Sequence, residues 1–258
     1  MDFEPIRLDG FEGREEALAG IKRYIHDITP IMFYRTNDLI HSRRVLWHLE
    51  EAIPDIVNVY GGDFDIGFAR TLALVHDDVE ILTGDVQLYD KEHMAREELE
   101  ALAREENNAI PKMVARYNAI ANGYAYDELL TAAKAKNRLE AQLVSFFDKF
   151  DGGGEAWHEI WAGNHNFLRP AGGDSGHNGG YVRQLNEFPS KYPALGTFFA
   201  EFPDYLPAPF DFKSAAEQGL LHTEFSFGRD SGYAPYERWK KTVMKREGVD
   251  LLVRQVEF

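Results

Sequence analysis

Apolar residues recur at intervals of three and four, between charged positions, through most of the first 150 residues. This period places apolar side chains on one face of an α-helix, whereas a half-buried strand would show strict alternation. No alternation of useful length occurs, so the sequence predicts an all-α protein. The expected helices span 13–26, 38–53, 65–77, 90–106, 112–121 and 126–150.

Several helix ends in this half carry recognisable signals. Asp38 is placed to cap the N-terminus of the helix 38–53, because its carboxylate can accept hydrogen bonds from the first backbone N–H groups. Pro54 and the pair Gly61-Gly62 punctuate the exit of that helix. Pro111 is expected at the first turn of the fifth helix, where its missing N–H group does no harm.

The composition changes after residue 150. Two stretches, 151–157 and 169–180, are rich in glycine and are predicted to be loops. Residues 186–212 hold five prolines among many aromatic residues, which indicates short helices and irregular structure laid over a helical core. The segment 234–258 returns to a helical pattern.

The chain has 28 basic and 43 acidic residues, a formal net charge of −15. Such a surface repels a phosphate backbone, and no basic stripe offsets the repulsion. Long nucleic acids and membranes are therefore not expected as partners. A small anion can still bind where a metal or local cations reverse the field.

The chain contains no cysteine, so any metal site must be built from histidine and carboxylate ligands. The first residues are acidic and lack the basic and apolar regions of a signal peptide. No apolar run approaches the roughly 20 residues that span a bilayer. These features predict a cytoplasmic, soluble protein.

The adjacent pair His76-Asp77 is the most informative feature. It ends the expected helix 65–77, in which the small residues Ala69 and Ala73 share the face of His76 and would let another helix approach closely. An imidazole and a carboxylate at a helix end can converge on one ion beyond that end. Taken alone, the pair is better explained as an ordinary helix C-terminus, where a histidine complements the helix dipole.

The acidic residues that follow favour a cation site. Four acids fall within nine residues, and they repel one another unless something cationic compensates. They are Asp77, Asp78, Glu80 and Asp85.

Two more candidate ligands lie on expected helices. His41 is on the helix 38–53, and Asp148 lies near the end of the helix 126–150, on the face of Ala141 and Val144. A carboxylate on an apolar face is costly unless it is paired or bound to a metal. Both positions therefore support a metal site.

Together these residues resemble a known family. The order His41, His76-Asp77, Asp148 is similar to that of the HD-domain superfamily of metal-dependent phosphohydrolases. The segment HDDVEILTGD resembles H-D-x-x-E-x-x-T-G-D of its 5′-deoxynucleotidase-like branch, and the match spans residues 35–151. The resemblance implies an HD-domain helical bundle over about residues 30–152, with a C-terminal helical and irregular extension, 153–258, packed on it. Residues 1–258 would form a single domain.

The resemblance also implies roles for individual residues. One divalent ion (Mn, Co, Ni, Fe, Zn or Mg) would be held, with open positions for water and a phosphate oxygen. Glu80 would orient or deprotonate the attacking water, and Asp85 would assist it or the leaving oxygen. The protein ligands of the ion would be His41, His76, Asp77 and Asp148.

The chain departs from the family pattern in two places. Ile40 precedes His41, where the deoxynucleotidase branch often has a glutamate, and Arg35 is the nearest candidate for the phosphate-contacting arginine. Relatives with two metal ions have further histidines between the His-Asp pair and the last aspartate, whereas this chain has only His93 there. One ion is therefore expected.

A few residues allow other interpretations. Asp151 could replace Asp148 as a ligand, although it begins a glycine-rich stretch and is expected to cap the helix end. His48 shares the face of His41 and is interpreted as a partly buried structural histidine. Three further histidines fit no usual ligand spacing and are interpreted as structural or near-site polar residues: His158, His165 and His177.

The predicted function is hydrolysis of a phosphate monoester by a metal-activated water, with a nucleoside 5′-monophosphate as the expected small phosphorylated substrate. The alternative is a non-catalytic HD-fold protein that binds or senses a nucleotide. Glu80 and Asp85 argue against that alternative, because a binding module does not need acids that handle water. A homodimer is compatible with a helical HD protein, but the sequence identifies no interface.

Overall fold

The computed structural model describes residues 3–24, 37–86, 88–161, 167, 176–207 and 233–247. The chain divides into two compact units, of which unit 1 comprises residues 1–23 and 37–145, and unit 2 comprises residues 24–36 and 146–258. Helices build both units, with one short hairpin in unit 1, and this confirms the predicted all-α class. That the two units fold as a single domain stays a prediction.

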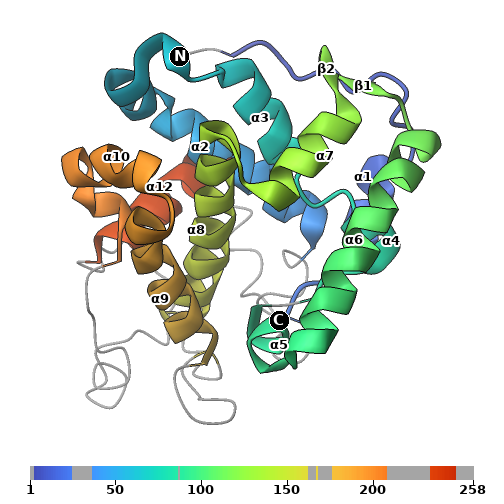
Figure 1. The fold of residues 1–258 in the computed structure, drawn as a ribbon. Helices are drawn as coiled ribbons and strands as arrows, with labels where there is room; N and C mark the ends of the chain where they lie inside the picture. The colour runs from blue at the N-terminus through green and yellow to red at the C-terminus, as the bar shows by residue number, and fades with distance from the viewer. Residues whose placement is uncertain are drawn as a thin grey trace. The chain divides into compact units, whose positions relative to one another are not determined.

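Unit 1 is a set of helices around α2 and α3, which lie side by side, with α7 against α3 and α6 against α7 (Figure 1). Two short strands form an antiparallel hairpin, with Ile120 opposite Ala125 and Ala121 opposite Tyr124. The elements are α1 Arg14–Gly20, α2 Asp38–Tyr60, η1 Gly61–Asp63, α3 Ile66–Val75, α4 Glu80–Thr83, α5 Leu88–His93, α6 Arg96–Arg116, β1 Ile120–Ala121, β2 Tyr124–Ala125, α7 Tyr126–Ala135 and the first turns of α8 Leu139–Trp161.

The apolar faces that the sequence predicts meet in the core of unit 1. Val45 and Leu49 of α2, Leu72 of α3, and Leu129 and Leu130 of α7 are all fully buried. Burial of each such side chain contributes about 1.5–3 kcal/mol relative to exposure. The long central helices are therefore held mainly by this packing, and they supply a rigid frame for the residues at their ends.

Helix α2 differs from the prediction at both ends. Its cap is Asn37, whose side-chain oxygen accepts a hydrogen bond from Ile40 N at 3.0 Å, so the prediction that Asp38 caps this helix is wrong. The helix also continues through Pro54 to Tyr60. The fully buried Ile53 and Ile56 lie on either side of the proline, and their packing holds the helix together across the lost backbone hydrogen bond.

Two other helix boundaries were predicted wrongly in unit 1. The segments 90–106 and 112–121 largely belong to one helix, α6, and Pro111 lies inside it. Conversely, the segment 126–150 is split between α7 and α8, because Lys136 adopts a left-handed conformation (φ 50°) that ends α7. A left-handed residue of this kind is a common helix stop, but lysine is not the residue that signals it in a sequence.

Unit 2 contains the rest of α8, followed by α9 Gly176–Lys191, η3 Pro193–Leu195, α10 Gly196–Glu201, η4 Pro203–Tyr205 and α12 Ala234–Glu247. Its core is aromatic. The rings of Phe146 and Phe199 lie 4.7 Å apart, and those of Phe198 and Tyr205 lie 5.0 Å apart, within the range of favourable aromatic pairs. In 186–207 the expected short helices and irregular structure are confirmed.

Helix α8 runs straight through Gly152–Gly154, where the sequence predicted a loop, and that prediction is wrong. The reason lies in the neighbouring side chains: a Cβ atom at Gly154 would overlap the indole of Trp239, and one at Gly152 would come within 2.6 Å of the ring of Tyr181. These glycines therefore serve the close approach of aromatic rings to the helix. The second glycine-rich stretch also enters a helix, since α9 begins at Gly176.

None of the described helices combines the length and the apolar character that crossing a bilayer requires.

We expect Gly154→Ala to destabilise the protein, although alanine favours a helix over glycine by up to about 1 kcal/mol. The new methyl group meets the buried Trp239, and such overpacking costs about 1–3 kcal/mol. Gly196→Ala is the matched control, because no atom lies within 4 Å of its Cβ position. Urea unfolding measures both variants, and a Gly154→Ala protein as stable as the control would contradict the close approach.

Candidate metal centre

His76 and Asp77 lie in the turn that follows α3, at the helix end where the sequence placed them. The carbonyl oxygen of Asp77 accepts a hydrogen bond from Glu80 N at 2.9 Å, and α4 begins at Glu80. The short connection between the two helices therefore carries the imidazole of His76 and the carboxylate of Asp77, and the carboxylate of Glu80 follows at the start of α4.

The imidazole of His76 is oriented by the backbone. Its Nδ1 lies 2.9 Å from the carbonyl oxygen of Ala73, and since a carbonyl can only accept, Nδ1 carries the proton. The lone pair is therefore on Nε2, as in metal-binding histidines whose other nitrogen donates to a carbonyl. Nε2 is buried, and no hydrogen bond reaches it from the described part of the chain.

His41 completes a group of three potential ligand atoms. It lies on α2 and is fully buried, and its Nε2 is 3.5 Å from Asp77 Oδ2. His76 Nε2 is 3.1 Å from the same oxygen. Ligands that bind one ion at about 2.0–2.2 Å lie about 3.0–3.5 Å from one another, so these three atoms fit a shared divalent ion. Two neutral nitrogens and one carboxylate suit Mn, Fe, Co, Ni or Zn.

A buried ion pair fixes the turn that carries this group. Arg14 on α1 bonds to both oxygens of Asp78, at 2.6–2.9 Å, and its guanidinium also donates to the carbonyl of Leu74 at 2.6 Å. The hydroxyl of Tyr126, on α7, donates to Asp78 Oδ2 at 2.6 Å. Asp78 therefore anchors the turn from behind, one residue after Asp77.

The Thr-Gly-Asp turn after α4 requires its glycine. Gly84 has φ 77° and ψ 160°, a backbone conformation that is essentially limited to glycine. Its N–H donates to Glu80 O at 2.8 Å and closes the end of α4. Asp85 follows directly.

The carboxylates of Glu80 and Asp85 lie near that of Asp38, the residue that the sequence predicted to cap α2. One oxygen of each lies within 4.8 Å of the others. Burial raises the pKa of Asp38 to about 8. The positive charge of Arg23 opposes this rise, and the negative charges of Asp77 and Asp85 add to it. Burial, followed by the charges of Asp77, Asp38 and Asp85, raises the pKa of Glu80 well above its ordinary value. The sequence did contain a signal that Asp38 lies near the site, because it precedes His41 by three residues and therefore lies on the same helix face.

Comparison with known proteins agrees with this geometry. The profile of the family described as 5′-deoxynucleotidase YfbR-like matches residues 29–174. The chain belongs to this family. The YfbR-like family lies in the HD-domain superfamily, and membership makes the chain a metal-dependent phosphohydrolase with a small phosphorylated substrate.

A solved structure of a conserved hypothetical protein from Pyrococcus furiosus has a similar fold, with a TM-score of 0.51 and 18% sequence identity. The match covers 73% of this chain and 92% of that one. No curated protein matches the chain. The likeness in structure confirms the fold of this YfbR-like protein and carries no information on its substrate.

The fourth predicted ligand, Asp148, is half-buried on α8 in the part that belongs to unit 2, and its carboxylate accepts a hydrogen bond from Lys149 Nζ at 2.8 Å. Its role as a ligand stays a prediction. The competing residue Asp151 does not cap a helix end, because it lies inside α8 and accepts a hydrogen bond from Trp239 Nε1 at 2.8 Å. Arg35, the predicted substrate-binding residue, lies outside the described residues.

The remaining histidines are placed as follows. His48 is buried on α2, and His93 is exposed on α5. His158 is buried in unit 2, with Nδ1 3.1 Å from the hydroxyl of Tyr236, so it has a structural partner as expected. His165 lies outside the described residues.

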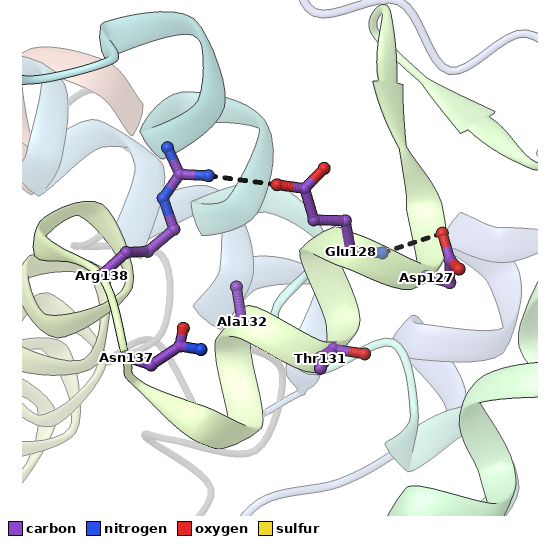
Figure 2. A pocket seen from close by; sticks show the side chains of 6 residues that line it. All are labelled: Asp127, Glu128, Thr131, Ala132, Asn137 and Arg138. Atoms are coloured by element: carbon purple, nitrogen blue, oxygen red, sulfur yellow. Dashed lines mark hydrogen bonds and ion pairs between the residues drawn. The ribbon is translucent and has the colours of Figure 1, made fainter.

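A separate hollow of about 470 Å³ lies at α7 and the start of α8 (Figure 2). Its lining contains none of the residues of the predicted metal site, and its charged groups are already engaged. Arg138 pairs with Glu128 at 3.3 Å, and Asp127 accepts a hydrogen bond from the backbone N–H of Glu128 (Figure 2). We assign it no part in the chemistry. It is lined by Asp127, Glu128, Thr131, Ala132, Asn137 and Arg138.

We expect Asp78→Asn to lower the free energy of unfolding by about 3–5 kcal/mol, because it leaves the buried Arg14 without its counter-charge. The control is Glu15→Gln, which removes the exposed partner of Arg43 and should cost less than about 1 kcal/mol. Denaturant unfolding measures both variants. Equal small losses would show that the ion pair does not anchor the turn.

The buried carboxyl of Asp38 predicts a pH dependence in the metal-free protein. Its pKa is about 8 in the folded state and about 3.9 when unfolded, so the folded chain binds this proton more tightly. The stability that it contributes is complete below about pH 4 and is lost as the pH rises through 8.

Unfolding with a chelator present, from pH 4 to pH 9, measures this dependence. Asp38→Asn should make it shallower, because asparagine cannot ionise, whereas the exposed Asp63→Asn should leave it unchanged. Identical slopes for all three proteins would contradict the assignment.

Proposed function

We propose that this YfbR-like protein hydrolyses a nucleoside 5′-monophosphate to the nucleoside and inorganic phosphate. The observation that carries the proposal is the buried position of Glu80, three residues after the candidate ligand Asp77 and close to Asp85. A protein that only bound a nucleotide would need the ligands but not these acids. The description of the family as 5′-deoxynucleotidases favours a deoxynucleotide.

The divalent ion would be held by His41, His76 and Asp77, with Asp148 as the proposed fourth ligand. When bound, it polarises the phosphoryl group and lowers the pKa of a bound water. The protein contributes the orientation of the ligands: Ala73 O fixes the tautomer of His76, and Asp78 anchors the turn beneath them.

Glu80 is proposed to accept a proton from the attacking water. The water oxygen forms a new bond to phosphorus, the bond from phosphorus to the 5′ oxygen breaks, and the nucleoside leaves with a proton. Burial raises the pKa of Glu80 above its ordinary value, and this makes its carboxylate a stronger proton acceptor. Asp85 is proposed to assist the water or the leaving oxygen.

Arg35 is proposed to contact the phosphate of the substrate, a role that rests on the sequence resemblance. A local cation is needed because the formal net charge of the chain is −15, and its field repels an anion. A cytoplasmic location and a homodimer likewise stay predictions.

We expect Glu80→Gln to lower kcat for phosphate release by about 10²–10⁴-fold, the usual contribution of a positioned proton acceptor. Glutamine keeps the size of the side chain but cannot accept the proton. The ion at the His-Asp group should remain, and atomic absorption measures it in the same preparation. Glu105→Gln, an exposed change on α6, is the control and should retain full turnover.

The substrates for this test are deoxyribonucleoside and ribonucleoside 5′-monophosphates, sugar phosphates and cyclic nucleotides, each with Mn, Co, Ni, Zn or Mg. Unchanged turnover in Glu80→Gln would remove its proposed role. Preference for sugar phosphates or cyclic nucleotides would overturn the substrate class. Absence of phosphate release from every substrate, despite a bound ion, would favour a nucleotide sensor.

A further inference from the structure

The three candidate ligands of the His-Asp group are held in different ways. His41 lies on the long helix α2, and the ring of His76 is oriented by a backbone carbonyl of α3. Asp77 lies in the turn of residues 76–79, outside both α3 and α4. The position of its carboxylate therefore depends on how firmly that turn is held, and first of all on the next residue, Asp78.

The carboxylate of Asp78 is held from two different helices. Arg14 of α1 donates to both of its oxygens, and the hydroxyl of Tyr126, the first residue of α7, donates to Oδ2 at 2.6 Å. A hydrogen bond from a hydroxyl to a charged carboxylate is short and strong. Tyrosine has only two rotatable side-chain bonds, so Tyr126 restrains its partner more than the long, flexible side chain of Arg14 does.

Tyr126 is itself fixed in the interior of unit 1. Its side chain is fully buried, and the ring of Phe11 meets it edge-on with 4.9 Å between the ring centres. Phe11 is buried as well and also stacks on the ring of Tyr117, at 5.3 Å. Burial, followed by the charge of Asp78, raises the pKa of the Tyr126 phenol above its ordinary value, so the hydroxyl keeps the proton that it donates.

A second tyrosine provides the comparison that isolates this contact. Helix α7 packs against α3, the helix that leads into the turn (Figure 1). At the start of α3, the hydroxyl of Tyr124 donates to Asp65, the N-cap residue of that helix, at 2.9 Å. One tyrosine hydroxyl therefore bonds to an aspartate at each end of α3, and the candidate ligands follow the end that Tyr126 secures.

We propose that Tyr126 is a positioning residue for the metal centre, which acts through Asp78 to hold the carboxylate of Asp77 against the two histidines. Asp77 Oδ2 lies 3.1 Å from Nε2 of His76 and 3.5 Å from Nε2 of His41. A site of this kind must be held to within about 0.5 Å, so a small displacement of the turn disturbs it. The inference rests on the candidate metal centre and not on the reaction, because metal affinity is measured without substrate.

The test is the zinc affinity of Tyr126→Phe, a change that removes one oxygen atom and keeps the ring and its packing. The full chain is stripped of metal and titrated with Zn²⁺ in competition with a chromogenic chelator. Loss of a supporting group at a metal site weakens binding about 10–100-fold, and we expect the lower end of this range because Tyr126 acts through Asp78. The visible absorption of bound Co²⁺, which reports the arrangement of its ligands, should change in the same variant.

Two controls exclude a general effect of lower stability. Tyr124→Phe removes the corresponding hydrogen bond to an aspartate at the other end of α3. Thr71→Val removes a fully buried hydroxyl in the middle of α3, which donates to Gly67 O at 2.8 Å. Both changes should lower the stability of the metal-free protein in urea, because each removes a hydrogen bond. Both should keep the zinc affinity and the Co²⁺ spectrum of the wild type.

Wild-type zinc affinity and an unchanged Co²⁺ spectrum in Tyr126→Phe would overturn the proposal, because Arg14 would then suffice to place Asp77. Losses of affinity in Tyr124→Phe and Thr71→Val as large as that in Tyr126→Phe would overturn it as well, since the cause would then be lower stability. If the wild type bound no metal, the metal centre itself would be wrong and this inference with it. Absence of phosphate release from a protein that binds zinc would bear on the proposed function alone.

Discussion

The buried ion pair between Arg14 and Asp78 is the interaction on which the metal centre depends. Two charges removed from water carry a large desolvation cost, which their attraction offsets only when the remaining donors and acceptors are satisfied. Here the carbonyl of Leu74 and the hydroxyl of Tyr126 supply those contacts. The pair thereby ties α1 and α7 to the turn after α3 and sets the place of Asp77.

Two other buried carboxylates near that turn, Asp38 and Glu80, are less well neutralised. Asp78 is neutralised by an arginine at 2.6 Å, whereas the buried Asp38 has, among the residues that the structure describes, only a long ion pair with Arg23, at 3.8 Å. A fold optimised only for stability would pair each buried carboxylate with a cation, as Arg14 is paired with Asp78. Retaining buried carboxylates with raised pKa values is therefore a cost in stability that catalysis can explain.

The parts of the site that were predictable are those that depend on local sequence. The position of His76-Asp77 at a helix end follows from neighbouring residues, and it is confirmed. The helix through Gly152–Gly154 could not be predicted, because its cause is the ring of Trp239, which lies far away in the sequence. The cap of α2 was missed by one residue, since Asn37 and Asp38 are equally suitable by chemistry and only the backbone distinguishes them.

The position of the α2 cap, at Asn37 and not at Asp38, also bears on function. The oxygens of a capping aspartate would accept hydrogen bonds from backbone N–H groups at the helix end. Here Asn37 accepts that hydrogen bond instead, which leaves the carboxylate of Asp38 for another role. Asp38 and His41 are then separated by three residues on one rigid helix, so α2 supplies a candidate ligand to the His-Asp group and a buried carboxylate close to Glu80 and Asp85. Any shift of this helix moves both groups together, so the candidate ligand and the buried carboxylate keep their positions relative to each other.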